Sequence, residues 1–280
     1  MSDRGIRSFI LNALAEDTGS GDHSSLASIP SSVTGHARLL VKENGIIAGL
    51  NVASEVFLIT DPSLETEILL EDGATVSHGD IALTVAGSVH SILRAERLVL
   101  NIMQRMSGIA TATAAYVEKV SGTKARITDT RKTTPGMRSL EKEAVRLGGG
   151  VNHRMGLYDM IMLKDNHVDY AGDITAAVRR TQEYLRLHKL PLKIEVESRS
   201  INEVREILEA GGVDRIMLDN FDILATREAV ALIGDRAETE SSGGITLANV
   251  RDYALCGVDF ISIGALTHHI KSLDMSLKAY

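Results

Sequence analysis

The stretch LKIEVESRSINEVREILEAGGVDRIMLDN, residues 192–220, decides the fold. A short apolar run at 192–196 is followed by an amphipathic stretch at 201–210 and by a second apolar run at 215–218. Short strands that alternate with helices of about 10–15 residues are typical of parallel β-α-β units. The stretch therefore predicts two parallel strands joined by one helix.

The same alternation extends over the second half of the chain. Further apolar runs lie at 125–127, 160–163 and 260–263, with a weaker one at 237–240, and helical patterns lie at 174–187, 223–233 and 247–256. The predicted strands are fewer than the roughly eight of a closed barrel, so we expect an incomplete parallel α/β barrel. A doubly wound open sheet is the alternative, although no Gly-x-Gly-x-x-Gly motif follows the first strand of this half.

The N-terminal part of the chain has a different pattern. Helical spacing at 6–15, 51–59 and 91–106 is mixed with strand patterns at 37–48, 64–70 and 81–85. Such a mixed order predicts a separate α/β domain before the barrel.

Composition indicates a soluble globular protein, with 44% hydrophobic and 24% charged residues and a net charge of −7. The acidic balance argues against a nucleic-acid partner, and no apolar run approaches the roughly 18 residues of a membrane span. The N-terminal residues lack a signal-peptide pattern, and the single cysteine, Cys256, forms neither an internal disulfide nor a multi-cysteine zinc site. We therefore expect a cytoplasmic protein that binds neither nucleic acid nor membrane.

Polar or glycine-rich residues follow the apolar runs. They are DTRKTTPG at 129–136, KDNH at 164–167, DN at 219–220, SSGG at 241–244 and GAL at 264–266, and NHR at 152–154 follows a triple glycine. The C-terminal ends of parallel barrel strands meet at one face, where barrel enzymes keep their reactive groups. A barrel built only for stability would not need polar residues at every strand end, so this pattern predicts an active site there.

Positive residues gather locally in this acidic chain. Between residues 124 and 167, nine Lys and Arg stand against five Asp and Glu. Arginine binds carboxylate or phosphate through two parallel hydrogen bonds, and lysine adds a compact charge. We interpret four of these residues, together with His153, as a site for two carboxylates and a diphosphate: Arg131, Lys132, Arg154 and Lys164.

The alternative is that these positive groups are surface charges paired with acids such as Glu141, Glu143 and Asp159. We favour that interpretation for Lys142 and Arg146, which belong to a helical stretch.

Glu195 and Asp219 lie on successive predicted strands, so their carboxylates could face one site. Carboxylates there suit Mg²⁺ shared with a phosphorylated substrate, or the hydroxyls of a sugar. The alternative is a salt bridge to a barrel lysine.

A glycine-rich loop resembles a phosphate cradle. Ser242, Gly243 and Gly244 precede a predicted helix at 245–255, whose N-terminus would favour an anion. Gly264, after the next strand, would complete the cradle.

Several long motifs give the chain a resemblance to the quinolinate phosphoribosyltransferases of NAD biosynthesis. They are SGIAT at 107–111, TKAR at 123–126, DTRKTTPG at 129–136, GGGVNHRMGL at 148–157, KDNH at 164–167, IMLDN at 216–220, ESSGGI at 240–245 and GALTH at 264–268. The resemblance implies an N-terminal α/β sandwich domain, residues 1–106, joined by the C-terminal tail 267–280. It implies an incomplete barrel of the type II phosphoribosyltransferases at 107–266, and a homodimer with shared active sites or a larger assembly.

The resemblance also implies roles for particular residues. Quinolinate would be held by Arg97 from the neighbouring subunit together with Arg131, His153, Arg154 and Lys164. Lys132, with help from Lys164, would face the phosphates of phosphoribosyl pyrophosphate (PRPP). Glu195 and Asp219 would bind the ribose hydroxyls and the Mg²⁺ shell. The 5′-phosphate would be bound by Ser242, Gly243, Gly244, Gly264 and His268.

The implied reaction transfers the phosphoribosyl group of PRPP to quinolinate, giving nicotinate mononucleotide, pyrophosphate and CO₂ in de novo NAD biosynthesis. Lys132, Lys164, Glu195 and Asp219 would carry its catalysis. Three alternatives are an aldolase-type lyase with a Schiff base on Lys164, a non-catalytic sensor or metal-uptake accessory, and a transferase that acts on nicotinate. The arginine cluster, the intact 131–132 and 164–167 motifs, and the number of positive groups favour the quinolinate enzyme.

Overall fold

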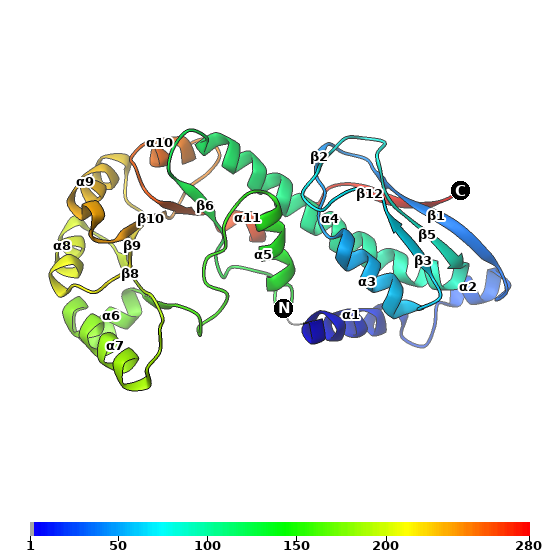
Figure 1. Ribbon diagram of the computed structural model, residues 1–280, viewed down its shortest axis with the longest axis horizontal. Helices are drawn as coiled ribbons and strands as arrows, with labels where there is room; N and C mark the ends of the chain where they lie inside the picture. The colour runs from blue at the N-terminus through cyan, green and yellow to red at the C-terminus, as the bar shows by residue number, and fades with distance from the viewer. Residues whose placement is uncertain (1–2) are drawn as a thin grey trace. The chain divides into compact units, whose positions relative to one another are not determined.

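The computed structural model describes residues 3–280, with side chains from residue 5 onward. The chain divides into two compact units. The first takes residues up to Ala114 together with Thr134–Gly149 and His269–Tyr280, and the second takes Ala115–Thr133 and Gly150–His268. Figure 1 shows that the first contains an antiparallel sheet and the second a ring of strands with helices outside it.

A four-stranded antiparallel sheet organises the first unit. Its order is β12-β1-β5-β3, with β1 at Thr34–Val41, β3 at Glu65–Ile68, β5 at Ile81–Ser88 and β12 at Met275–Ala279. Ala37, Leu39 and Val41 are buried while the residues between them are not, as expected for a sheet that packs through one face. Because β12 pairs with β1, the C-terminal end of the chain returns to its N-terminal part.

Five helices belong to the first unit: α1 (Asp3–Thr18), α2 (His23–Ser28), α3 (Leu50–Thr60), α4 (Val89–Val120) and α5 (Arg138–Leu147). The last turns of α4, from Ala115 onward, belong to the second unit. The strand pattern at 37–48, which the turn signal Glu43-Asn44-Gly45 divides in two, corresponds to two strands that do not pair with each other. The second, β2 at Gly45–Ile46, pairs with β4 at Thr75–Val76.

The units differ from the predicted domains in three places, the smallest being Thr267 and His268, which belong to the second unit and not to the tail. Helix α4 runs unbroken through residue 106, where a boundary is predicted, and a side chain at Gly108 would meet the carbonyl oxygen of Lys271 at 2.2 Å. Residues 134–149, predicted in the barrel, belong to the first unit because the buried Glu141 of α5 pairs with Arg105 of α4 at 2.6 Å.

Six parallel strands form the sheet of the second unit. They are β6 (Arg126–Thr128), β7 (Ile161–Leu163), β8 (Ile194–Ser198), β9 (Arg215–Asp219), β10 (Glu238–Ser242) and β11 (Phe260–Ser262). Their order is β6-β11-β10-β9-β8-β7, so successive strands from β7 to β11 are neighbours and β6 closes onto β11. A doubly wound sheet reverses its strand order near the middle. The single winding direction is that of a barrel, left open between β6 and β7.

The helices of the second unit lie outside the strands (Figure 1). They are α6 (Asp165–Ala171), α7 (Ile174–His188), α8 (Ile201–Ala210), α9 (Ile223–Ile233), α10 (Val250–Ala254) and α11 (Ala265–His268), with a 3₁₀ turn at Gly234–Arg236. Asp173, Ser200 and Asp222 cap three of them, each accepting a backbone N–H three residues on. Val196 and Ile216 of the strands pack with Val204 and Ile207 of α8 in one buried core.

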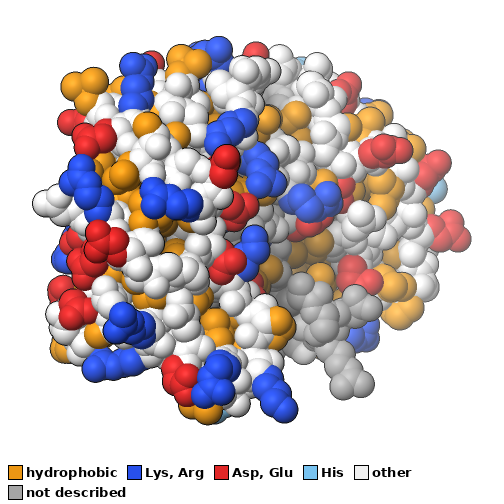
Figure 2. Space-filling model, turned by 60° about the vertical axis from the view of Figure 1, so that its left-hand side comes forward, with side chains coloured by type: hydrophobic (Ala, Val, Ile, Leu, Met, Phe, Trp, Pro, Cys, Tyr) orange, Lys and Arg blue, Asp and Glu red, His pale blue; other side chains and the backbone are white. Residues whose placement is uncertain are grey.

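Figure 2 brings forward the side on which Figure 1 labels α6, α8 and α9. Positive and negative side chains there are interspersed with small groups of hydrophobic ones, which is the appearance of a solvated helical face. Within residues 3–280, no helix combines the length and apolarity required to span a bilayer.

Candidate active site

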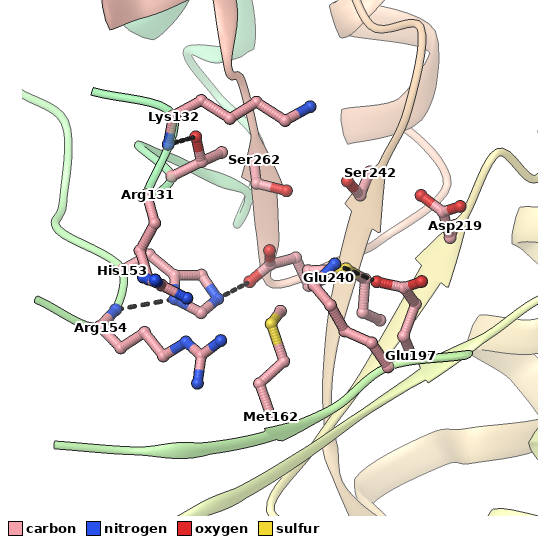
Figure 3. Close-up of a pocket in the computed structure, with 13 residues that line it drawn as sticks. Arg131, Lys132, His153, Arg154, Met162, Glu197, Asp219, Glu240, Ser242 and Ser262 are labelled. Atoms are coloured by element: carbon pink, nitrogen blue, oxygen red, sulfur yellow. Dashed lines mark hydrogen bonds and ion pairs between the residues drawn. The ribbon is translucent and has the colours of Figure 1, made fainter. Parts of the chain in front are cut away.

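A pocket of about 240 Å³ lies at the C-terminal ends of the parallel strands. It is lined by Thr130, Arg131, Lys132, His153, Arg154, Met162, Lys164, Glu197, Met217, Asp219, Glu240, Ser242 and Ser262. All the predicted cationic residues of the barrel therefore meet in one pocket. Figure 3 shows Arg131, His153 and Arg154 on one side of it, with Glu197 and Asp219 on the other.

The segment after the triple glycine is held by a chain of hydrogen bonds. The backbone N–H of His153 donates to Asp129 Oδ1 at 3.0 Å, and that of Arg154 donates to His153 Nδ1 at 2.7 Å. The Arg154 side chain donates from Nη1 to the carbonyl oxygen of Met160 at 3.2 Å. Because Nδ1 accepts this hydrogen bond, it carries no hydrogen, and the arrangement corresponds to the neutral imidazole tautomer with its hydrogen on Nε2.

Arg131 and Arg154 put two like charges beside the same pocket. Burial, and then the positive charge of Arg131, lowers the pKa of Arg154. Two guanidinium groups that repel each other are stabilised by an anion between them, so this side of the pocket is built for negative charge.

The acidic side of the pocket carries one tight ion pair. Lys164 Nζ lies 2.6 Å from Glu197 Oε2, with the lysine side chain 46% exposed and the glutamate 8% exposed. Asp219, at the end of β9, accepts a hydrogen bond from Asn220 Nδ2 at 2.7 Å. Both carboxylates are thus held at the pocket while Lys164 keeps a solvent-facing side.

The prediction that Glu195 faces the pocket is wrong. Its side chain is fully buried, and Glu197, two residues further along β8, is the strand's lining residue. The strand register explains the difference, because Glu195 is level with Arg215 at the start of β9 whereas Glu197 is level with Met217. Inward-facing barrel residues stack in layers, and only the layer nearest the C-terminal ends reaches the mouth.

Ser242 lines the pocket as predicted and Gly243 and Gly244 follow it, but the helix expected at 245–255 is shorter and begins only at Val250. The chain turns at 243–249 and forms only the short α10. Thr246 N–H donates to Asn249 Oδ1 at 2.7 Å, and Asn249 Nδ2 donates to the Gly244 carbonyl oxygen at 3.3 Å. These local hydrogen bonds favour a turn over a helix, so any phosphate bound here meets a turn and not a helix N-terminus.

Gly243 is required by two constraints. Its φ of +91° is one that side chains rarely adopt, and a Cβ there would lie 2.2 Å from Asn220 Oδ1. Asn220 itself has a φ of +57°, and its N–H donates to the Ser242 carbonyl oxygen at 2.8 Å. The two loops after β9 and β10 are therefore tightly joined.

Gly264, His268 and Lys132 also lie together. A Cβ at Gly264 would lie 3.0 Å from His268 Nε2 and 3.2 Å from Lys132 Cδ. Thr267 Oγ1 donates to the Lys132 carbonyl oxygen at 2.8 Å. The predicted phosphate-side residues after β6 and β11 thus form one neighbourhood.

Three other predicted residues lie in the first unit. Arg97 lines a separate hollow there with Glu16 and Asp17, and its reach to a neighbouring subunit stays a prediction. Arg146 pairs with Glu143 in an exposed ion pair at 2.6 Å, as predicted. Lys142, on the same helix α5, is not a surface charge as predicted, because its side chain is completely buried.

Two further carboxyl groups are fully buried here: Glu240, in the lining of the pocket, and Glu195, beneath it. Burial raises the pKa of Glu195 to about 7, and burial together with the charge of Glu195 raises the pKa of Glu240 to about 7. Arg215 Nη1 lies 2.9 Å from Glu240 Oε2.

Six lining residues were not predicted as site residues: Thr130, Met162, Glu197, Met217, Glu240 and Ser262. The position of Glu197 nearer the C-terminal end of its strand was an available signal. The two methionines have the sequence pattern of ordinary buried strand residues, and Glu240 lies on the weakest of the predicted strands, so neither position gave a signal.

The pocket, the barrel winding and the cationic side together define an α/β-barrel enzyme site for a small polyanion. Models of the quinolinate phosphoribosyl transferase N-terminal and C-terminal domains match residues 22–107 and 109–278. The chain belongs to the quinolinate phosphoribosyltransferase family.

Relatives of known sequence and structure agree with this assignment. The chain is 47% identical to the chloroplastic nicotinate-nucleotide pyrophosphorylase (carboxylating) of Arabidopsis thaliana, covering 98% of this chain and 82% of that protein. It is 44% identical to the probable nicotinate-nucleotide pyrophosphorylase (carboxylating) of Synechocystis, covering 95% and 89%. The crystal structure of NadC from Streptococcus pyogenes superposes with a TM-score of 0.93 at 38% identity, covering 100% of this chain and 99% of the other.

Proposed function

We propose that this chain transfers the phosphoribosyl group of PRPP to quinolinate, with loss of CO₂, to give nicotinate mononucleotide and pyrophosphate in de novo NAD biosynthesis. The observation that carries the proposal is the pair of guanidinium groups, Arg131 and Arg154, beside one pocket that two carboxylates line from the other side. Quinolinate has two adjacent carboxylates and needs such a paired cationic surface.

The cationic side would orient the pyridine. Arg131 and Arg154 would hold the carboxylates, and Lys164 would add charge from the far side of the pocket. The thioether side chains of Met162 and Met217 give the lining apolar surface suited to an aromatic ring. His153, with Nδ1 occupied by the Arg154 N–H, would act on the substrate through position more than through charge.

The acids at the strand ends fit a hard cation. Mg²⁺ prefers carboxylate oxygens and substrate phosphates, and Glu197 and Asp219 offer carboxylates at neighbouring strand ends. They would hold Mg²⁺ delivered with PRPP or accept the ribose hydroxyls. When bound, Mg²⁺ would offset negative charge on the departing pyrophosphate.

The chain's own residues account for the remaining chemistry by position and electrostatics. The pyridine nitrogen, oriented by the arginines, attacks C1 of the ribose as the bond to pyrophosphate breaks. Glu197 and Asp219 stabilise the positive charge that develops on the sugar, and Lys132 faces the negative leaving group. As the C2–carboxylate bond breaks and CO₂ departs, its electron pair stays on C2, where the adjacent positively charged pyridinium nitrogen stabilises it, and a proton from solvent then adds at C2. Positioning of two reactants can lower the activation free energy of such a reaction by about 7–11 kcal/mol.

One assay tests the proposal. The purified protein is mixed with Mg²⁺, PRPP and either quinolinate or nicotinate, and mononucleotide, pyrophosphate and CO₂ are measured. We expect equimolar products with quinolinate and little turnover with nicotinate. Turnover of nicotinate alone, or of neither acid, would contradict the proposal.

We further propose that two copies share their active sites, with Arg97 completing the pocket of the partner. Mixing an Arg97→Ala variant with a Lys164→Ala variant tests this, because one pocket of each mixed dimer would then contain both wild-type side chains. We expect each variant alone to be nearly inactive and the mixture to regain up to about one quarter of wild-type activity. A mixture that dissociates and reassociates without regaining activity would refute sharing. The cytoplasmic location stays a prediction.

A further inference from the structure

A short turn at 155–159 follows Arg154, and one carboxylate closes it. The backbone N–H of Met155 donates to Asp159 Oδ2 at 2.6 Å, and that of Gly156 donates to Asp159 Oδ1 at 2.8 Å. A Cβ at Gly156 would lie 2.5 Å from the ring of Tyr158, so the turn also requires a glycine there. The Asp159 side chain thereby ties the end of the turn to its beginning.

The residues on either side of this turn are joined a second time, by the arginine itself. Arg154 immediately precedes the turn and Met160 immediately follows it. Arg154 Nη1 donates to the carbonyl oxygen of Met160 at 3.2 Å. Because Asp159 draws residues 155 and 156 toward residue 159, it holds this carbonyl oxygen within reach of the guanidinium.

The guanidinium keeps its other nitrogens for a ligand. Within the described residues 3–280, Nε and Nη2 of Arg154 have no hydrogen-bond partner, and Arg154 lines the pocket. Figure 3 shows its side chain extending toward Met162. Arginine binds a carboxylate through two parallel N–H groups. With Nη1 held by the backbone, the Nε–Nη2 edge is the one that a carboxylate in the pocket would meet.

The charge of Asp159 favours the same arrangement. Burial, and then the charge of Arg131, lowers the pKa of Arg154, and the negative charge of Asp159 is among those that raise it. Asp159 is exposed and lies outside the pocket lining. It therefore offsets part of the repulsion between the two arginines without presenting a negative charge to a bound anion.

We propose that Asp159 is a positioning residue for Arg154: it closes the 155–159 turn so that Met160 holds Nη1 and the Nε–Nη2 edge of the guanidinium faces one carboxylate of the substrate. Asp159 does not touch the substrate in this arrangement. The inference rests on the proposed function, because quinolinate supplies the carboxylate. Loss of the Asp159 carboxylate should then weaken quinolinate binding and leave PRPP binding unchanged.

A purely structural role is the alternative, since aspartates commonly accept backbone N–H groups in turns and at helix starts. Asp173 provides a matched control of this kind. It accepts the N–H of Ala176 at 2.6 Å at the start of α7 and is also exposed. Asp173→Ala removes the same type of hydrogen bond at a residue that does not line the pocket, so a structural role alone predicts similar effects of Asp159→Ala and Asp173→Ala.

Calorimetric titration of quinolinate and PRPP separates the two roles. We expect Asp159→Ala to raise the Kd of quinolinate about five- to tenfold, and Asp159→Asn, which keeps one acceptor oxygen, to raise it about two- to threefold. The Kd of PRPP in both variants, and both Kd values in Asp173→Ala, should stay within about twofold of wild type. An unchanged Kd of quinolinate in Asp159→Ala, or equal losses for both ligands, would overturn the proposal.

A double-mutant cycle tests whether Asp159 acts through Arg154. In an Arg154→Met background, Asp159→Ala should raise the Kd of quinolinate by less than about twofold, because the group that it positions is already gone. Fully additive effects would overturn the proposal. If Asp159→Ala does not fold, Asp159→Asn measured with and without Arg154→Met decides in the same way.

Hydrogen exchange of the Met155 and Gly156 amides tests the turn without any substrate. We expect both amides to exchange at least about tenfold faster in Asp159→Ala than in the wild type, and at the wild-type rate in Asp173→Ala. Equal rates in Asp159→Ala and the wild type would remove the hydrogen bonds on which the inference depends. A wild-type protein with both amides protected that binds PRPP but no quinolinate would instead refute the proposed function.

Discussion

Arg131 and Arg154 approach the same pocket from consecutive polar segments of the barrel, and the charge of Arg131 adds to burial in lowering the pKa of Arg154. The protein thus holds two cations in mutual repulsion. Such an arrangement is expected where an anion with two charged groups binds, because binding relieves the repulsion.

Arg131→Met is therefore expected to act oppositely on affinity and on stability. Loss of a charge-assisted, bidentate contact should weaken quinolinate binding by about 10- to 100-fold, while the ligand-free protein becomes equally or slightly more stable. Calorimetric titration and thermal unfolding measure the two effects. Arg179→Met, an exposed arginine of α7, is the control and should change neither. A marked loss of stability in Arg131→Met would contradict the repulsion.

Removal of Mg²⁺ should abolish activity, and substitutions of the strand-end acids should change the metal dependence. Asp219→Asn preserves shape and removes one charge, so we expect the Mg²⁺ concentration for half-maximal rate to rise about tenfold. Initial rates over a Mg²⁺ series with PRPP held constant provide the measurement. Asp235→Asn, in the exposed 3₁₀ turn, should behave as wild type. An unchanged metal dependence in Asp219→Asn would remove that residue from the metal site.

The turn after β10 offers a matched pair of glycines. Both Gly243 and Gly244 have positive φ, but a Cβ meets Asn220 at 2.2 Å only at Gly243, and nothing within 4 Å at Gly244. We expect Gly244→Ala to cost about 1 kcal/mol of unfolding free energy and Gly243→Ala distinctly more, about 2–4 kcal/mol. Chemical denaturation of both variants measures this. Equal losses would show that the close approach to Asn220 is easily relieved.

The buried carboxylates predict a dependence of stability on pH. Burial raises the pKa of Glu240 to about 7 from an ordinary 4.5, so between these values the folded state retains a proton that the unfolded state has released. Stability from this group is then fully present below about pH 4.5 and decreases as pH rises to about 7.

Urea denaturation at several pH values should show this decrease, and Glu240→Gln should lessen it, leaving the part that the raised pKa of Glu195 contributes. The control is Glu238→Gln, at the more exposed end of the same strand, which should keep the wild-type slope. A slope as steep in Glu240→Gln as in the wild type would assign the proton to another group.

The barrel and its cationic pocket follow from local features of the chain. Apolar runs separated by amphipathic stretches predicted all six parallel strands, because period and spacing are properties of the chain itself. The positions of Arg131, Arg154 and Lys164 just after such runs predicted their convergence, since parallel strands end at a common face.

Tertiary structure decided which of two similar residues reaches the mouth. Glu195 and Glu197 face the same way on β8, and only the register with β9 places one beneath the other. The buried Lys142 and the turn at 245–249 depended likewise on neighbours that are remote in sequence or on local side-chain hydrogen bonds.

The sequence by itself therefore determined the order of elements, the charge of the site and the face on which it lies. Only the folded structure determined depth: which carboxylate lines the pocket and which lies beneath it. The physical reason is that periodicity is encoded locally, whereas depth within a barrel depends on the stagger between strands, which their packing sets.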